Sequence, residues 1–156
     1  MGRRRSYPYK GYTMASKSEV MFAKQCDEMG IPWDYESEFF MWNPPPPKPK
    51  RYTPDFPVPT KAGGIIYLEY KGYLRNAAEK LKMTSMKKQH PELDIRFVFE
   101  KANKPMLGAQ KRKDGTKQTH AQWAESYGFP WMQFNPRQKK TLKECMPKSW
   151  LKEMAI

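Results

Sequence analysis

Two acidic residues and a lysine in the middle of the chain have types and spacing that suit a metal-binding site. Asp55 follows Pro54, and Glu69 and Lys71 stand fourteen and sixteen residues after Asp55. Residues two apart on a strand project from the same face, so we expect Glu69 and Lys71 to point together. Two carboxylates at close range repel each other and therefore favour a hard divalent cation between them.

A magnesium or manganese ion held by Asp55 and Glu69 would suit the hydrolysis of a phosphodiester. Mg²⁺ takes few protein carboxylates and completes its shell with water and phosphate oxygens. It would polarise the phosphate and acidify a bound water, while Lys71 would orient that water or help to deprotonate it. A structural interpretation stays open, because Asp beside proline is common in turns and Glu-x-Lys on an exposed strand is often a solvated ion pair.

A hairpin is the element that must bring Asp55 to the other two residues. Residues 52–58 and 65–71 read as extended segments, and the Lys-Ala-Gly-Gly run at 61–64 reads as the turn between them. Strands paired in this way place Asp55 on one patch with Glu69 and Lys71.

A helix and an aromatic strand are predicted ahead of this hairpin. Ser16 and Glu19 have capping-box spacing, and Gly30 stands where a left-handed residue ends a helix. The aromatic-rich residues 33–42 favour a strand. Residues 1–13 carry arginine and tyrosine without an apolar period, which indicates a flexible basic arm ahead of a single domain at 14–156.

Residues 43–50 form a proline-rich break in the chain. Proline has no backbone donor and clashes with helix, so Pro44–Pro47 and Pro49 predict stiff polyproline II structure. At ~3.1 Å per residue, residues 44–50 would span roughly 20 Å. Such a rigid spacer would hold two parts of the molecule apart or carry the chain across to another molecule.

The second half of the chain alternates predicted helices and strands. In order, these are a helix over 74–89, a strand over 94–100, a basic loop over 101–117, a helix over 119–128, a strand over 129–134 and a short helix beginning at Ser149. The residues expected on the inner face of the first of these helices are Leu74, Ala78, Leu81 and Ser85. The whole order predicts an α/β fold with a mixed central sheet flanked by helices.

The balance of charge points to a polyanionic partner. Lys and Arg number 29 and Asp and Glu 16, a net charge of +13, so nucleic acid is the first candidate and an acidic membrane surface the second. The longest apolar run, at 65–68, is far shorter than the ~20 residues of a transmembrane helix, and the N-terminus lacks the apolar core of a signal peptide. We therefore expect no membrane partner and an intracellular location. Two cysteines and two histidines are too few for a disulfide framework or a zinc finger.

Basic residues that could neutralise DNA phosphates fall into four clusters. They are Arg3, Arg4 and Arg5 in the arm; Lys48, Lys50 and Arg51 at the spacer; Lys80, Lys87 and Lys88 on the 74–89 helix; and Lys101, Lys104, Lys111, Arg112 and Lys113 in the basic loop. The loop is the strongest candidate, because its five charges fall within thirteen residues. Recognition would rest on the shape and spacing of phosphates, since no base-reading module is apparent in the sequence.

Three segments resemble the bacteriophage endonuclease I family of Holliday-junction resolvases, which lies within the PD-(D/E)xK nucleases. They are Tyr-Thr-Pro-Asp-Phe at 52–56, Glu-Tyr-Lys-Gly at 69–72 and the run from 89 to 99, which is the most specific. The resemblance extends over about residues 16–153. It implies a restriction-endonuclease-like core, a domain-swapped homodimer, and a divalent metal that serves the cleavage of branched DNA in the cytoplasm of a phage-infected host.

The resemblance also implies roles for individual residues. Asp55 and Glu69 are expected to be metal ligands, Lys71 the catalytic lysine, and Glu19 an additional catalytic acid that reaches the site assembled by the partner chain. A capping role explains Glu19 equally well. Two other functions stay open: a non-catalytic basic protein that binds nucleic acid, and a less selective nuclease of the same superfamily that nicks duplex DNA. A pure binder would gain nothing from carboxylates set against phosphates.

Overall fold

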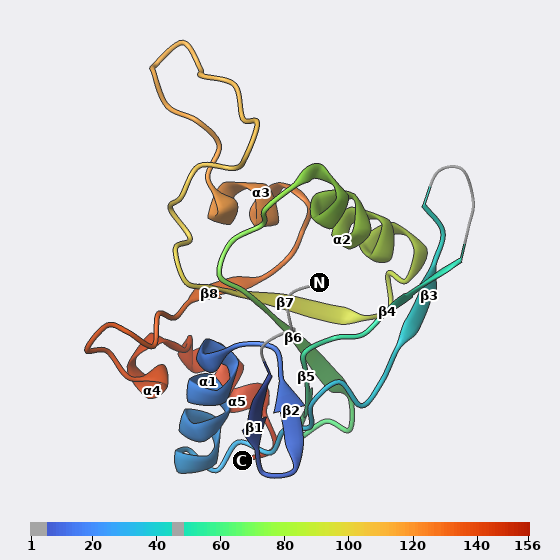
Figure 1. Ribbon diagram of the computed structural model, residues 1–156, viewed down its shortest axis with the longest axis vertical. Helices are drawn as coiled ribbons and strands as arrows, with labels where there is room; N and C mark the ends of the chain where they lie inside the picture. Colours follow the sequence, from blue (N-terminus) through green and yellow to red (C-terminus); the bar gives the residue numbers. More distant parts are fainter. Residues whose placement is uncertain (1–5, 45–48) are drawn as a thin grey trace.

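A mixed sheet of four strands forms the centre of the molecule. In the computed structural model, which describes residues 6–44 and 49–156, its strands are β5 (Phe56–Pro59), β6 (Ile65–Lys71), β7 (Asp94–Phe99) and β8 (Trp131–Gln133), in that order across the sheet. β5 runs antiparallel to β6, whereas β6, β7 and β8 are parallel to one another. The predicted α/β class and mixed central sheet are confirmed (Figure 1).

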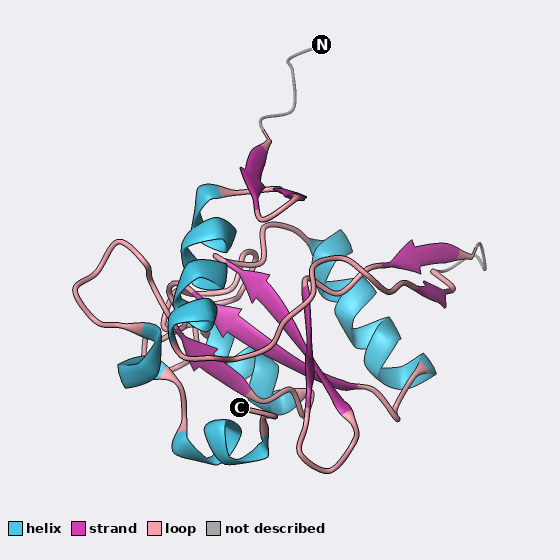
Figure 2. Ribbon diagram, turned by 90° about the horizontal axis from the view of Figure 1, so that it is seen from below, coloured by secondary structure: helices cyan, strands magenta, loops and turns pink. Residues whose placement is uncertain are grey.

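Helices cover both faces of this sheet. α1 (Lys17–Glu28), α4 (Leu142–Cys145) and α5 (Lys148–Glu153) lie on one side, and α2 (Ala77–Gln89) and α3 (His120–Ser126) lie on the other (Figures 1 and 2). Parallel neighbours need crossover connections. α2 occupies the crossover from β6 to β7, and α3 occupies the one from β7 to β8.

The central strands contribute to two cores, because successive side chains point to opposite faces. Leu68 and Val98 belong to the core on the α1 side, whereas Tyr67 and Phe97 belong to the core under α2 and α3. The strand predicted at 94–100 is confirmed as β7. All of its residues from 95 to 99 are buried, since neighbouring strands and helices cover both faces.

The hairpin predicted around the glycine turn is confirmed, and its register is the one that the site needs. Phe56 of β5 pairs with Leu68 of β6, so Asp55, one residue earlier, is level with Glu69. In the turn, Gly63 has a φ of 92°, a conformation that residues with a Cβ rarely adopt.

Helix starts follow the predicted caps in two of three cases. Ser16 Oγ caps α1 by accepting a backbone amide of its first turn at 3.1 Å. Thr119 and Gln122 form a complete capping box at the start of α3. The predicted cap at Ser149 is wrong, because α5 begins one residue earlier and its N-cap position is Pro147.

The predicted arm is a β-hairpin that packs on α1. Its strands are β1 (Tyr7–Tyr9) and β2 (Tyr12–Met14), paired antiparallel. Asp27 of α1 accepts a hydrogen bond from the Tyr9 hydroxyl, and Lys10 Nζ lies 2.9 Å from the same carboxylate. The prediction of a flexible arm is therefore wrong for residues 7–13.

The strand predicted over 33–42 is wrong except at its end, where β3 (Phe40–Trp42) forms. Upstream, the Glu36 amide donates a 3.2 Å hydrogen bond to the Asp55 carbonyl, beside the edge of β5. Glu36 has a φ of 48°. This left-handed conformation interrupts extended pairing, so residues 33–39 connect α1 to β3 irregularly.

The strands on either side of the proline-rich segment pair with each other. β3 pairs antiparallel with β4 (Lys50–Tyr52) (Figure 2). In this pairing Trp42 stands opposite Lys50. Residues 45–48 themselves lie outside the described residues. Because the residues on either side of the segment are direct partners, the prediction of a spacer that holds two parts of one chain apart is wrong.

α2 begins later than predicted and buries a different face. Its N-cap is Asn76, whose side chain accepts the Glu79 amide at 2.9 Å. Met83 and Met86 are buried, whereas Leu81 is 43% exposed. The prediction counted the helical period from Leu74. Leu74 is buried but precedes the helix, so the residues counted from it do not mark the buried face of α2.

The last third of the chain contains the predicted loop and one helix that was not predicted. Residues 101–117 form a loop that projects from the body of the molecule (Figure 1). β8 is shorter than the strand predicted at 129–134. α4 was not predicted, although Thr141 and Glu144 have capping-box spacing and form the complete box at its start. None of the helices in the described residues has the length and apolar composition that crossing a membrane requires.

Candidate active site

Asp55, Glu69 and Lys71 meet at the carboxyl end of β6. The Tyr70 backbone amide donates a 2.8 Å hydrogen bond to Asp55 Oδ2. Lys71 Nζ lies 3.5 Å from Glu69 Oε1, and the two side chains are 19% and 4% exposed. The register of the hairpin and the alternation of the strand thus bring together the three residues that the sequence singles out.

A buried tyrosine holds Glu69 from its other side. Tyr52 ends β4, and its hydroxyl donates a 2.6 Å hydrogen bond to Glu69 Oε2. The Tyr52 side chain is 1% exposed. One oxygen of Glu69 therefore faces Lys71 and the other faces Tyr52, which fixes the plane of the carboxylate.

The electrostatics of this cluster favour a bound cation. Burial raises the pKa of the Asp55 carboxyl well above its usual range, and the negative charges of Glu69 and Glu19 raise it further. Burial lowers the pKa of Lys71, but the charges of Glu69 and Asp55 outweigh this effect and leave it above the usual value. One ammonium thus stands among three carboxyl groups that repel one another.

Glu19 comes to this site from the amino end of α1 in the same chain. Its Oε1 accepts the Ser16 hydroxyl at 3.1 Å and its Oε2 accepts the Tyr35 hydroxyl at 3.0 Å. Burial raises the pKa of Glu19, and the charges of Glu36 and Glu69 add to the rise. Ser16 caps the helix and also holds the Glu19 side chain, so the local cap and the site share these two residues.

A pocket of about 550 Å³ reaches the site through Glu19 and Lys71. Gly72, Glu100 and Arg137 also line it. The resemblance implies that Glu19 completes the site of a partner chain, whereas here it lines a pocket with Lys71 of its own chain.

The donor set of the site fits Mg²⁺ or Mn²⁺ with two protein carboxylates. Asp55 and Glu69 supply the hard oxygen donors that these ions prefer, and Mg²⁺ usually keeps several waters. Within residues 6–44 and 49–156, no three His, Cys, Asp or Glu side chains form a group able to hold a metal ion. Glu19 is therefore a third acid beside the two candidate metal ligands, and both of its oxygens accept hydrogen bonds from hydroxyl groups.

Four residues that surround the predicted ones were not singled out by the sequence: Tyr52, Tyr70, Glu100 and Arg137. The Tyr70 hydroxyl donates a 2.9 Å hydrogen bond to Glu100 Oε1, and Arg137 Nη1 lies 3.6 Å from the same oxygen. The sequence held a signal for Glu100 and Arg137, because these two residues follow the strands β7 and β8. The carboxyl ends of parallel strands meet at one edge of a sheet, where ligands commonly bind.

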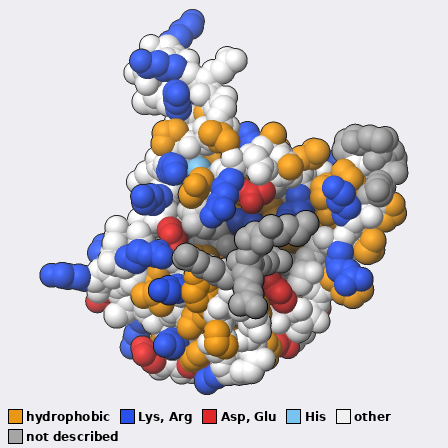
Figure 3. Space-filling model, viewed as in Figure 1, with side chains coloured by type: hydrophobic (Ala, Val, Ile, Leu, Met, Phe, Trp, Pro, Cys, Tyr) orange, Lys and Arg blue, Asp and Glu red, His pale blue; other side chains and the backbone are white. Residues whose placement is uncertain are grey.

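The basic loop presents its predicted DNA-binding residues to solvent. All five are exposed: Lys101, Lys104, Lys111, Arg112 and Lys113. Figure 3 shows basic side chains on the projecting loop and on the face below it. The role of the loop in binding DNA stays a prediction.

The other predicted DNA-binding residues differ in their surroundings. Lys50, Arg51 and Lys88 are exposed, and the Arg51 guanidinium stacks 4.1 Å from the ring centre of Phe39. Lys80 and Lys87 are half-buried, and their ammonium groups donate to the carbonyls of Leu107 and Gly128 at 3.3 and 3.1 Å. Arg3, Arg4, Arg5 and Lys48 lie outside the described residues.

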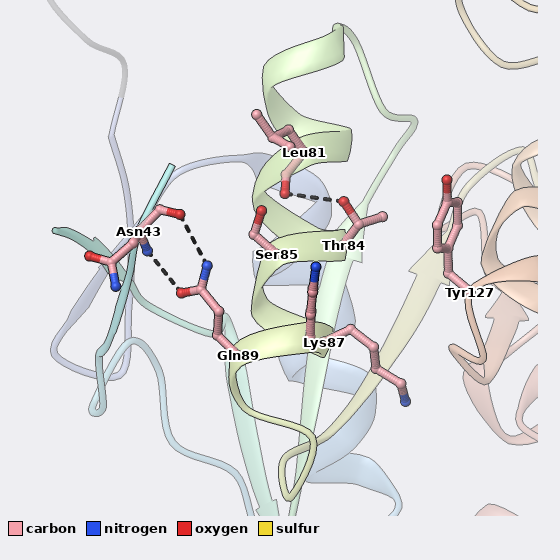
Figure 4. Close-up of a pocket in the computed structure, with 8 residues that line it drawn as sticks. Asn43, Leu81, Thr84, Ser85, Lys87, Gln89 and Tyr127 are labelled. Atoms are coloured by element: carbon pink, nitrogen blue, oxygen red, sulfur yellow. Dashed lines mark hydrogen bonds between the residues drawn. The ribbon is translucent and has the colours of Figure 1, made fainter. Parts of the chain in front are cut away.

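A larger hollow of about 740 Å³ lies elsewhere, along the outer surface of α2. Figure 4 shows Asn43 and Gln89 joined by two hydrogen bonds on one side of it and Tyr127 on the other. Among the described residues that line this hollow there is no carboxylate. It therefore lacks the groups for metal-assisted hydrolysis.

Comparison with known proteins identifies the family. A family profile described as phage endonuclease I matches residues 3–156. "Endodeoxyribonuclease 1" of Enterobacteria phage T3 is 33% identical over 123 residues, which cover 77% of this chain and 71% of that protein. "Endonuclease I" of Escherichia phage T7 is 30% identical over 138 residues, which cover 86% of this chain and 76% of that protein. Together with its own motifs, these matches show that the chain belongs to the phage endonuclease I family.

Proposed function

We propose that the protein is a metal-dependent endodeoxyribonuclease that cleaves branched DNA, Holliday junctions included, by paired hydrolysis of phosphodiesters inside the host cell. One observation carries this proposal: Asp55, Glu69 and Lys71 converge at the carboxyl end of β6. Asp55 is fixed there by a 2.8 Å hydrogen bond, and Lys71 lies 3.5 Å from Glu69. Membership of the phage endonuclease I family supports the same chemistry.

Asp55 and Glu69 are the residues that would hold Mg²⁺ or Mn²⁺. In the metal-free protein their charges repel each other across a buried site, so a divalent cation would relieve an unfavourable interaction. A bound ion would polarise the scissile phosphate and lower the pKa of a coordinated water. Tyr52 and the Tyr70 amide keep the two carboxylates aimed at their shared position.

Lys71 serves as a cation in this proposal. Its raised pKa keeps the amine protonated at neutral pH, because Glu69 and Asp55 stabilise the charge. A protonated amine can orient the attacking water by donating to it, and it offsets the charge that develops on the phosphate oxygens. The same charges oppose a role as general base, which would need the neutral amine.

Asp55→Asn tests the proposal most directly. The wild type is expected to cut a four-way junction in Mg²⁺ and to leave it intact when a chelator is added. The variant is expected to bind the junction with unchanged affinity but to cut it at least 10²-fold more slowly, since it loses a metal ligand. Equal cleavage by both proteins would remove Asp55 from the mechanism.

A linear duplex of the same sequence separates the alternative functions. Cleavage of duplex and junction at equal rates would favour a less selective nuclease. Binding of both DNAs without cleavage in Mg²⁺ or Mn²⁺ would favour a non-catalytic basic protein, and the acidic cluster would then need another explanation.

We further propose that the active form is a domain-swapped homodimer. Paired cuts in a four-way junction suit two sites related by a twofold axis. The β3–β4 hairpin is the connection that would open, because it joins the part of the chain containing α1 to the part containing β5 and β6. Exchange of α1 between two copies would preserve the contacts that Glu19 makes with the pocket.

Mixing two inactive variants tests the swap. Glu19→Gln and Lys71→Ala are expected to be inactive alone. In a swapped heterodimer of the two, one site receives the intact Glu19 and retains the intact Lys71, so nicking of one strand returns. If each chain completes its own site, both sites stay defective and the mixture stays inactive. Sedimentation at micromolar concentration provides the independent measurement, and a monomer there would exclude the dimer.

A further inference from the structure

Arg137 joins two elements that border the pocket. Its Nη1 donates a 3.0 Å hydrogen bond to Ser18 Oγ of α1 and lies 3.6 Å from Glu100 Oε1, just beyond β7. Ser18 is the neighbour of Glu19. The Glu100 amide donates a 3.3 Å hydrogen bond to the carbonyl of Gly72, the residue after Lys71. The guanidinium is therefore held between the segments that carry Glu19 and Lys71.

Stability does not explain this arrangement. The Arg137 side chain is 62% exposed and its ion pair with Glu100 is long, and exposed ion pairs contribute little to folding. A guanidinium has five N–H donors in a rigid fork. Of the three guanidinium nitrogens of Arg137, only Nη1 has a partner among the described residues, which leaves the donors on Nε and Nη2 for a ligand.

The charges around the pocket indicate what that ligand is. Three carboxylates line it, those of Glu19, Glu79 and Glu100. A phosphodiester that enters must be met by a cation. Of the other cations that line the pocket, Lys71 is already paired with Glu69, and the Arg75 guanidinium lies over the Tyr73 ring, 5.5 Å from its centre. Arginine suits this role, because its fork matches two oxygens of one phosphate.

We propose that Arg137 binds a phosphate of the DNA strand that is cut, through the donors on Nε and Nη2. Ser18 and Glu100 are its positioning residues, since they hold Nη1 and so aim the rest of the fork. A side chain ordered before the substrate arrives loses less conformational entropy on binding. This inference rests on the proposed nuclease function and adds a substrate contact from the segment after β8.

Kinetics of matched variants give the first test. Arg137→Gln is expected to lower kcat/KM for a junction about 10²-fold, and Arg137→Lys, which keeps the charge without the fork, is expected to lower it less. Lys139→Gln removes the same charge two residues away and is expected to cut like the wild type. Unchanged thermal unfolding of Arg137→Gln shows that the loss is not a folding defect.

The positioning role of Glu100 is tested in two backgrounds. Glu100→Gln is expected to slow cleavage in the wild type but to have no further effect in Arg137→Gln, because it acts through the guanidinium. An equal effect in both backgrounds would assign Glu100 to Tyr70, its other partner, and would overturn its role toward Arg137.

Substitution of single phosphates locates the contact. Junctions with one uncharged methylphosphonate near the mapped cut are bound to Asp55→Asn and to the Asp55→Asn, Arg137→Gln double variant. At one position, the methylphosphonate is expected to weaken the binding of Asp55→Asn about tenfold. The same substitution is expected to change the binding of the double variant hardly at all. If the wild type cuts DNA and no such position exists, this inference alone is overturned. If the wild type cuts no DNA, the proposed function is overturned and the inference falls with it.

Discussion

The hydroxyl of Tyr52 and the carboxylate of Glu69 are joined by a 2.6 Å hydrogen bond inside the protein. Tyr52 ends β4, shortly after the proline-rich segment, whereas Glu69 lies in β6 of the central sheet. Burial and the charge of Glu69 raise the pKa of Tyr52 well above its usual range, so the hydroxyl remains a donor at neutral pH. The β3–β4 hairpin is thereby linked directly to the candidate metal ligand.

Tyr52→Phe is expected to slow cleavage more than it weakens junction binding. Without the hydroxyl, Glu69 Oε2 loses its buried partner, and the unfolding free energy should fall by about 1–3 kcal/mol. Tyr67→Phe is the matched control, because that hydroxyl donates to Glu38 at 3.1 Å, away from the site. Cleavage rates and urea unfolding of the two variants provide the measurement. Equal rates for Tyr52→Phe and wild type would show that this hydrogen bond does not position Glu69 for catalysis.

Neutralising the basic loop should change the salt dependence of DNA binding. Changing Lys111, Arg112 and Lys113 to Gln is expected to reduce the slope of log K against log salt by up to about 0.9 for each residue that contacts a phosphate. Binding titrations between low and moderate salt measure this slope. A control triple variant at Lys61, Lys148 and Lys152 removes three exposed charges elsewhere. Identical slopes for both triple variants would mean that the loop makes no special contact with DNA.

Asp27 should make the attachment of the amino-terminal hairpin depend on pH. Burial opposes its charge, but hydrogen bonds from Tyr9, Lys10 and Trp33 outweigh it, so the pKa of Asp27 is lowered. A lowered folded-state pKa gives stability that is present above the ordinary aspartate pKa of ~3.9 and is lost as the pH falls through the folded value.

Comparison of Asp27→Asn with the wild type tests this dependence. At pH 7 the variant is expected to unfold more easily, by on the order of 1 kcal/mol, because it loses charged hydrogen bonds. The difference should shrink as the pH falls below about 4. Chemical unfolding at pH 7 and pH 3 measures it, and a difference that stays constant would contradict the role assigned to the carboxylate.

His120 should be important for stability although it lies outside the acidic cluster. It is 1% exposed, its Nε2 accepts the Leu74 amide at 2.9 Å, and its Nδ1 therefore donates to the Lys104 carbonyl at 2.7 Å. His120→Phe preserves an aromatic ring but leaves the Leu74 amide without its acceptor, whereas the Lys104 carbonyl still accepts the His120 backbone amide at 3.0 Å. The unfolding free energy should therefore fall by about 1–3 kcal/mol. His120→Gln can restore one of these bonds and should lose less. If the two variants are equally stable, packing and not hydrogen bonding explains the burial of this residue.

Local signals in the sequence were sufficient for the elements that carry the acidic cluster. A glycine turn between two extended segments specifies the β5–β6 hairpin, and its register follows from the short turn. Strand alternation then places Glu69 and Lys71 on one face. Elsewhere the local signal was misleading. Residues 33–39 form no strand, because Trp33 and Tyr35 pack on Phe56 of β5 while Glu36 takes a left-handed conformation.

By itself, the sequence determined that Asp55, Glu69 and Lys71 come together, since they lie within seventeen residues and one hairpin joins them. Only the tertiary structure decided what surrounds them. Arg137 and Ser18 are 119 residues apart in the chain yet share a 3.0 Å hydrogen bond. No periodic pattern encodes such a contact, because it forms only when α1 and the segment after β8 pack against the same edge of the sheet.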